Sequence, residues 1–125
     1  MPQAEFRYEE EQLKIEIQWM GEDLCIRFYG GDRGHIGSIA MAEPRPSLTG
    51  SGQTSATVSV YTYSGHKDDI VASSVAREVA AELNRKCVVI VGIHYDHFTQ
   101  ERLAAVNRIA AQIPVMAEEA YGAIH

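Results

Sequence analysis

Four of the five histidines lie in three short polar segments that also carry acidic and basic side chains. The segments are residues 30–35 (GGDRGH), 64–69 (SGHKDD) and 94–97 (HYDH). Imidazole, carboxylate and cationic groups in close succession are the residue types that bind anions, coordinate transition metals or transfer protons. A shared site requires a fold that brings the three segments together.

The second segment has the features of an anion site. Gly65 precedes a predicted helix, whose first N–H groups have no partner inside the helix and whose dipole favours a phosphate. Lys67 would add a point charge, and Arg33 in the first segment would add a bidentate grip. Alternatively, Asp68 and Asp69 satisfy this helix start by themselves.

The histidines also allow a metal site. His35, His66 and His94, with Asp96 or His97 as a further ligand, would form a nitrogen and oxygen set suited to Zn, Mn or Fe. Their spacing matches no recognised metal motif, and solvated or locally hydrogen-bonded imidazoles are the simpler interpretation. Both interpretations stay open at this stage.

Nucleophilic catalysis has little support in the sequence, because no Ser or Cys occupies a nucleophile context near residues 94–97. Cys25 and Cys87 lie in apolar runs, which is typical of small buried side chains in a reducing compartment, and we expect both thiols to be free. We therefore expect a ligand-binding protein that is not an enzyme.

Alternation of apolar and polar residues predicts the strands that position the polar segments. The predicted strands span residues 13–19, 24–29, 36–42, 56–63 and 87–93. Residues 30–35 are predicted to be a glycine-rich loop, residues 43–55 a mobile surface excursion able to act as a lid, and the acidic run 9–11 a solvated face.

Helical periodicity begins at Lys67, where Val71, Val75, Val79 and Leu83 form one apolar stripe. Thr99 is expected to cap a second helix, which Pro114 should kink or interrupt. The apolar positions expected in that helix are Leu103, Val106, Ile109 and Ile113.

The predicted fold class is therefore α/β (α+β), with a mixed sheet of about five strands. A β-meander of four strands is followed by α-β-α, the helices pack on the sheet, and residues 1–125 form a single domain.

This order of elements brings the three polar segments to one end of the sheet. Strands of a meander are antiparallel, so the second strand ends where the third begins and the fourth ends. A helical crossover returns the fifth strand parallel to the fourth, and its end arrives there too. Ligand crevices in α/β sheets form at such carboxyl ends.

Composition excludes several classes of partner. A formal charge of −6 without a cluster of Lys or Arg argues against nucleic acid. No segment reaches the roughly 18 to 20 apolar residues of a membrane span, and the acidic start is unlike a signal peptide, so we expect a cytoplasmic protein without a membrane. The apolar face of the C-terminal helix is compatible with a homodimer.

Three motifs together resemble the LpdD-like prenylated-flavin chaperones, whose fold is similar to small proteasome-assembly-chaperone domains. They are GGDRGHIGSIA, SGHKDD and VVIVGIHYD. The resemblance spans nearly the whole chain and implies a protein that holds prenylated FMN (prFMN), the product of a flavin prenyltransferase. It further implies delivery of prFMN to a UbiD-type decarboxylase of gallate or related aromatic acids.

Transferred residue by residue, the resemblance implies a cofactor site with or without a divalent metal that joins protein and phosphate. The implied site residues are Arg33, His35, Gly65, His66, Lys67, His94 and Asp96. Gly34 and His97 depart from the family pattern, which puts His97 in doubt as a member of the site. The alternatives are a protein-assembly chaperone or docking module without a small-molecule ligand, and a metal-dependent hydrolase.

Overall fold

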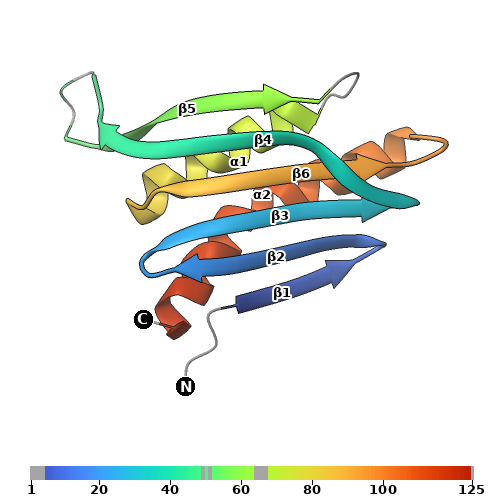
Figure 1. Ribbon diagram of the computed structural model, residues 1–125, viewed down its shortest axis with the longest axis horizontal. Helices are drawn as coiled ribbons and strands as arrows, with labels where there is room; N and C mark the ends of the chain where they lie inside the picture. Colours follow the sequence, from blue (N-terminus) through green and yellow to red (C-terminus); the bar gives the residue numbers. More distant parts are fainter. Residues whose placement is uncertain (1–4, 49, 51, 64–67, 125) are drawn as a thin grey trace.

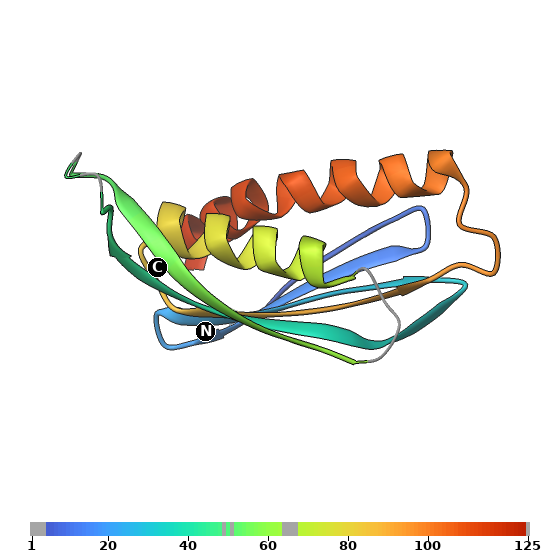
Figure 2. The ribbon, with the colours of Figure 1, turned by 90° about the horizontal axis from the view of Figure 1, so that it is seen from above.

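The computed structural model describes residues 5–48, 50, 52–63 and 68–124. Its strands form one six-stranded sheet in the order β1-β2-β3-β6-β4-β5, and both helices cover the same face of that sheet (Figures 1 and 2). The elements are β1 (Glu5–Glu10), β2 (Leu13–Met20), β3 (Asp23–Gly31), β4 (Arg33–Pro46), β5 (Thr54–Thr62), α1 (Asp68–Leu83), β6 (Cys87–His94) and α2 (Gln100–Ile124). The predicted class, a mixed sheet with helices packed on it, is confirmed, with one strand more than expected.

The core lies between the helices and the inner face of the sheet. Each strand contributes alternate residues to it, as the pleat requires. On β2 the buried set is Leu13, Ile15, Ile17 and Trp19, the same residues whose alternation predicts the strand. Val75 and Val79 of α1 and Ile109 and Ile113 of α2 close the core from the other side.

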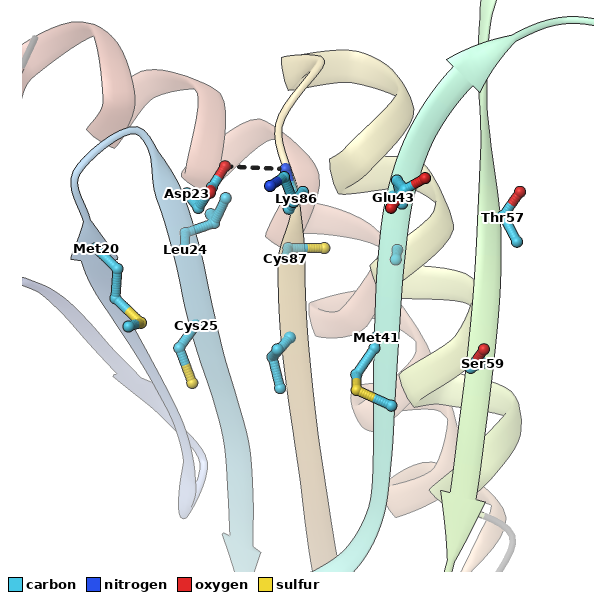
Figure 3. Close-up of a pocket in the computed structure, with 12 residues that line it drawn as sticks. Met20, Asp23, Leu24, Cys25, Met41, Glu43, Thr57, Ser59, Lys86 and Cys87 are labelled. Carbon is cyan, nitrogen blue, oxygen red and sulfur yellow. Dashed lines mark hydrogen bonds between the residues drawn. The ribbon is translucent and has the colours of Figure 1, made fainter.

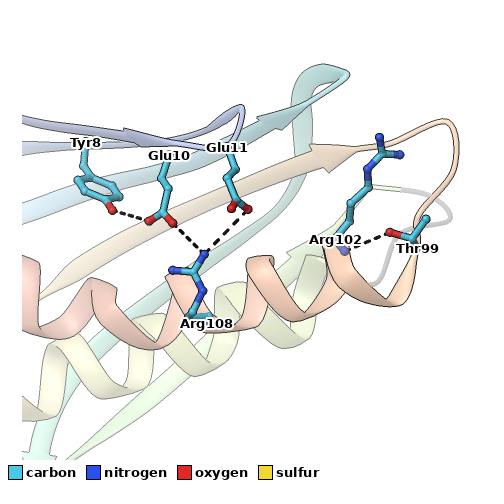
Figure 4. A network of polar contacts seen from close by, with 6 residues as sticks. All are labelled: Tyr8, Glu10, Glu11, Thr99, Arg102 and Arg108. Carbon is cyan, nitrogen blue, oxygen red and sulfur yellow. Dashed lines mark hydrogen bonds and ion pairs between the residues drawn. The ribbon is translucent and has the colours of Figure 1, made fainter.

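The N-terminal strand β1 is absent from the sequence prediction, which treats residues 9–11 as a solvated face. Phe6 and Tyr8 alternate with charged residues and pack on the core, which is the reason that this segment joins the sheet. Arg108 of α2 donates a hydrogen bond of 2.8 Å to Glu10, which also accepts one from the Tyr8 hydroxyl (Figure 4). This network ties the acidic β1–β2 turn to α2.

The last strand, β6, lies in the middle of the sheet, and the predicted four-strand meander is therefore wrong at β3 and β4. β6 is parallel to β3 and antiparallel to β4. It runs parallel to β5, as expected, without being its neighbour. The physical reason is the apolar run CVVIVGI, which gains most from a central position with neighbours on both sides.

Two segments that the sequence predicts as irregular are largely strand. β3 reaches Gly31 and β4 begins at Arg33, so Asp32 alone forms the turn and residues 30–35 are no extended loop. Gly30 and Gly31 have φ values of 133° and 80°, which explains their glycine identity. Of residues 43–55, β4 takes those up to Pro46 and β5 those from Thr54 onward.

The second helix begins where the sequence predicts. The Thr99 side-chain oxygen accepts a hydrogen bond of 3.2 Å from the Arg102 N–H, which is an N-cap contact (Figure 4). α2 continues through Pro114, and the buried side chains of Ile113 and Ala117 anchor it on both sides of the proline. Leu103, predicted to be an apolar contact, is half exposed.

The apolar face of α2 is used inside the monomer, so it gives no support to the homodimer expected from it. Val106, Ile109 and Ile113 are buried in the core. Among the described helices, none combines the length and the apolar character that crossing a bilayer requires.

Candidate functional site

The ends of four strands meet as predicted at the end of the sheet where β6 finishes. His94, the last residue of β6, is in register with Gly31 of β3 on one side and with Arg33 of β4 on the other. β5 runs antiparallel to β4 and therefore also ends here, at Thr62. Chain reversal at Asp32 keeps the first polar segment directly beside the third.

A carboxylate accompanies His94. Its Nε2 lies 3.1 Å from Asp96 Oδ1. Asp96 is in turn placed by Asp32, whose side chain accepts a hydrogen bond of 2.9 Å from the Asp96 N–H, while the Asp32 N–H donates to the His94 carbonyl at 2.7 Å. The turn and the HYDH segment therefore hold each other in position.

His35 reaches the same place because β4 is irregular at this point. Register is lost between Gly34 and Ser38, so residues 35–37 bulge opposite a single residue, Gly92 of β6. The bulge depends on that glycine: a Cβ on Gly92 would overlap the His35 carbonyl, far inside the 3.0 Å that real Cβ atoms keep. Bulges of this kind redirect a side chain, here an imidazole.

The bulge brings two histidines and a helix start together. The His35 and His94 rings stand edge to face with their centroids 6.5 Å apart. His35 Nε2 also lies 3.6 Å from Asp68 Oδ2 in the first turn of α1, where the two side chains are 25% and 13% exposed. Each imidazole thus has a carboxylate close to its Nε2. The His94–Asp96 pair is within hydrogen-bond distance, and such a bond orients the imidazole ring.

The predicted site residues have different outcomes. His35, His94 and Asp96 lie together, and Arg33 begins the adjoining strand with an exposed side chain. Gly65, His66 and Lys67 lie outside the described residues.

For the doubtful candidate His97, the described contacts are made by its backbone: the carbonyl accepts a hydrogen bond of 2.6 Å from Arg102 and one of 3.1 Å from the Thr99 N–H. Two members of the site were missed by sequence reasoning: Asp32 was seen only as part of a loop, and Asp68 only as a helix cap. The pairing of Asp68 with His35 depends on the bulge, and the sequence signal for that bulge is the glycine at position 92 inside an apolar strand.

The described part of the site is acidic. Asp32, Asp68 and Asp96 lie among the residues of the site, and the nearest strand position with a positive charge is Arg33, in register with His94. Within residues 5–48, 50, 52–63 and 68–124, no three His, Cys, Asp or Glu side chains approach closely enough to hold a metal ion. Of the predicted metal ligands His35, His66 and His94, the middle one lies outside that part of the chain.

A broad hollow lies elsewhere, at the opposite end of the sheet where β3 and β6 begin. It has a volume of about 690 Å³ and is lined by Met20, Cys25, Met41 and Val88, with Lys86 and Glu43 at its end (Figure 3). The groove is broad and its walls are mainly apolar, so it lacks the imidazoles and paired carboxylates that make the histidine site a candidate for chemistry. We therefore place the candidate site at His35 and His94.

Comparison with known proteins identifies the family. Residues 7–121 match the family described as "Prenylated flavin chaperone LpdD-like domain". The chain belongs to this family. This match confirms the resemblance that three sequence motifs of the LpdD-like chain predict. The matched range includes every described residue of the histidine site.

Two further comparisons agree with this assignment. The LpdD-like chain is 30% identical over 96 residues to Protein LpdD of Lactiplantibacillus plantarum, an alignment that covers 75% of this chain and 65% of that protein. A solved structure, "Crystal Structure of a Novel Chaperone Complex for Yeast 20S Proteasome Assembly", matches with a TM-score of 0.57 and 12% identity over 95% of this chain and 99% of that one. The second likeness establishes a shared fold.

Proposed function

We propose that this protein is a non-catalytic carrier that binds prFMN at the His35–His94 site and delivers it to a UbiD-type aromatic-acid decarboxylase. The observation that carries the proposal is the meeting of two carboxylate-paired imidazoles, with centroids 6.5 Å apart, in a chain of the LpdD-like family. As a carrier, the protein would hold and protect the cofactor, while the decarboxylation chemistry would belong to the enzyme that receives it.

The charges around the site indicate how the phosphate of prFMN would be held. Asp32, Asp68 and Asp96 would repel a dianion, and Arg33 offers a compensating charge. Lys67 would supply a second cation. A divalent Mn, Fe or Zn ion bound by His35, His66 and His94 would remove the conflict, because it could accept both imidazole nitrogen and phosphate oxygen as ligands.

The residues present fit such an ion through their chemistry. Imidazoles that bind metals usually have a carboxylate or carbonyl behind them that fixes the tautomer, and Asp68 and Asp96 are positioned to act in this way. They would then be positioning residues, while the imidazoles and Arg33 would contact cofactor or metal.

The proposal is tested by cofactor retention. The chain is produced in cells that also contain a flavin prenyltransferase, purified, and examined by visible spectroscopy and mass spectrometry for bound prFMN. We expect the wild-type protein to be coloured and His35→Ala and His94→Ala to lose at least about tenfold in affinity, the effect of about 1.4 kcal/mol. Metal content is measured on the same samples before and after chelation.

His97→Ala is the matched control, because it removes an imidazole from the same segment and keeps the carbonyl that accepts hydrogen bonds from Arg102 and Thr99. This variant should retain prFMN. His94→Gln supplies a second test should the alanine variant fold poorly. A colourless wild-type protein without measurable affinity, or equal retention by all three histidine variants, would refute the proposal.

Delivery is tested separately from binding. Loaded protein is mixed with apo-decarboxylase, and the transfer of the cofactor absorbance is followed after separation of the two proteins. We expect transfer that depends on the decarboxylase and restores its activity. Retention of prFMN without transfer would be consistent with the proposed binding site and would refute the carrier role.

A second candidate function is a protein-docking module that carries no small molecule. The observation that favours it is the open apolar groove around Met41 and Val88, on the sheet face that neither helix covers (Figures 2 and 3). Under this hypothesis Met41→Lys should abolish binding to the decarboxylase, while His35→Ala and His94→Ala should leave it intact. Under the carrier hypothesis His35→Ala and His94→Ala lose prFMN, and this loss does not depend on the effect of Met41→Lys.

A further inference from the structure

Two tyrosines stand exposed beside the histidine site, at the end of the edge strand β5. Tyr61 is 63% exposed, and Tyr63, which directly follows β5, is 49% exposed. Their rings lie edge to face with the centroids 5.2 Å apart. Single exposed apolar side chains are common on protein surfaces, but two rings that hold each other in one orientation form a preorganised platform for a flat ligand.

The backbone of both tyrosines is joined to the bulge that carries His35. The Tyr63 N–H donates a hydrogen bond of 2.8 Å to the Gly37 carbonyl, and the Ser38 hydroxyl donates one of 3.2 Å to the Tyr61 carbonyl. Neighbouring strands lie about 5 Å apart, so the tyrosine pair begins one strand spacing from the bulge. The position of the two rings therefore depends on the same segment of β4 that positions His35.

The pleat directs the tyrosines to the sheet face that neither helix covers (Figure 2). Ala56 of β5 is buried in the core, and residues an odd number of positions away point to the opposite face. Ile93 of β6 is buried in the same core, so alternation directs His94 to the uncovered face as well. Only β4 separates β5 from β6, which sets the tyrosines and His94 roughly 10 Å apart across the sheet (Figure 1).

We propose that Tyr61 and Tyr63 form a subsite for the flavin ring of prFMN, which stacks on them while the phosphate is held at the histidine site. This inference rests on the proposed function. The ribityl chain between ring and phosphate can span the separation across β4. Stacking on tyrosine suits a broad, flat ring of low charge, and Ile36 in the bulge, 57% exposed, adds apolar area beside it.

Phe98, another exposed aromatic side chain at this end of the sheet, is less suited to the flavin ring. Its ring stands edge to face with that of Tyr95, with the centroids 5.1 Å apart. Tyr95 is only 6% exposed, and the Arg102 guanidinium lies over its ring at 4.7 Å from the centroid. That pair therefore offers a single exposed ring, and Phe98 supplies the matched control for the two tyrosines.

The test measures the affinity of the full chain for prFMN by titration followed with visible absorbance. We expect Tyr61→Thr and Tyr63→Thr each to raise the Kd about tenfold, the size of one lost stacking contact. Threonine keeps the preference for a strand, so both variants should fold, and urea unfolding checks this. Tyr61→Phe and Tyr63→Phe keep the ring and should bind as wild type does, and so should Phe98→Ala.

The absorption spectrum supplies a second readout, which a merely structural role would not change. At saturating prFMN, the band of the bound cofactor should differ between wild type and the two threonine variants, because stacking perturbs the electronic transition of the ring. The phenylalanine variants should keep the wild-type band.

The outcomes distinguish this inference from the proposed function. If wild type binds prFMN and both threonine variants bind it equally well with the same band, the flavin subsite is overturned and the proposed function is unaffected. The subsite is also overturned if Phe98→Ala or the phenylalanine variants lose as much affinity as the threonine variants. A wild-type protein without affinity for prFMN overturns both.

Discussion

The substitution Gly92→Ala tests whether the β4 bulge creates the site. The added Cβ would overlap backbone atoms of His35 and lie 3.2 Å from the Ile36 nitrogen. A flexible side chain could rotate away from such a clash, but these atoms belong to the backbone of a neighbouring strand, so β4 has to separate from β6. Overpacking costs typically 1 to 3 kcal/mol, and a backbone clash belongs at the upper end, about 3 kcal/mol.

Urea unfolding measures this cost, with the single Trp19, 7% exposed, as the fluorescent probe. With a slope of about 2 kcal/mol per molar urea, the midpoint should fall by about 1.5 M. Gly122→Ala is the matched control, because nothing lies within 4 Å of a Cβ there and the residue is helical. Alanine should leave that midpoint unchanged or raise it by up to about 0.5 M, since helix propensity favours it by up to about 1 kcal/mol.

The same pair of variants separates stability from function. Gly92→Ala should also lose prFMN, because His35 moves with the bulge, while Gly122→Ala should keep it. Equal urea midpoints for the two variants would show that β4 and β6 are not packed as described and would remove the structural basis for the position of His35.

Three further predictions concern the N-cap of α2, the contact of Glu10 with Arg108 and the thiol of Cys87. Thr99→Ala should lower the free energy of unfolding by about 1 kcal/mol through loss of the N-cap, measured by urea unfolding, with Thr99→Ser close to wild type. Hydrogen bonds from Arg108 and then Tyr8 lower the pKa of Glu10, so the ionised carboxylate stabilises the fold above the ordinary glutamate pKa and this contribution is lost as the pH falls through the lowered pKa. Glu10→Gln should therefore be less stable than wild type at pH 7, and acid-denaturation curves should show that the difference disappears at low pH. Burial raises the pKa of Cys87 to about 12, so a thiol reagent at neutral pH should modify it only on unfolding, and rapid labelling of the native protein at this position would contradict its burial.

Much of the fold follows from local patterns. The alternation in β2 and β3 and the change to helical periodicity in α1 each reflect one face of an element packing on the core, and this information lies within a few residues of sequence. The meeting of strand ends also follows, because it requires only the direction of each strand. His35 and His94 were therefore predicted to be neighbours, and the structure confirms it.

The order of strands could not be obtained in the same way. Placing β6 between β3 and β4 depends on a competition between alternative pairings of strands that are far apart in sequence, and local propensity says little about it. β1 was missed because its three glutamates hid the alternation of Phe6 and Tyr8. The contact between His35 and Asp68 was missed because it depends on the bulge, which exists only once β6 supplies Gly92.

The central position of β6 has a consequence for how the chain acquires its structure. β1, β2 and β3 form one antiparallel unit and β4 and β5 another, and only β6 joins them. Its pairing with β3 connects Leu24 to Cys87, a separation that makes closure slow because a long loop has to be ordered first. During synthesis, we expect the two units to keep unpaired inner edges until β6 has left the ribosome, and chains that stop before β6 expose these edges to pairing with other chains.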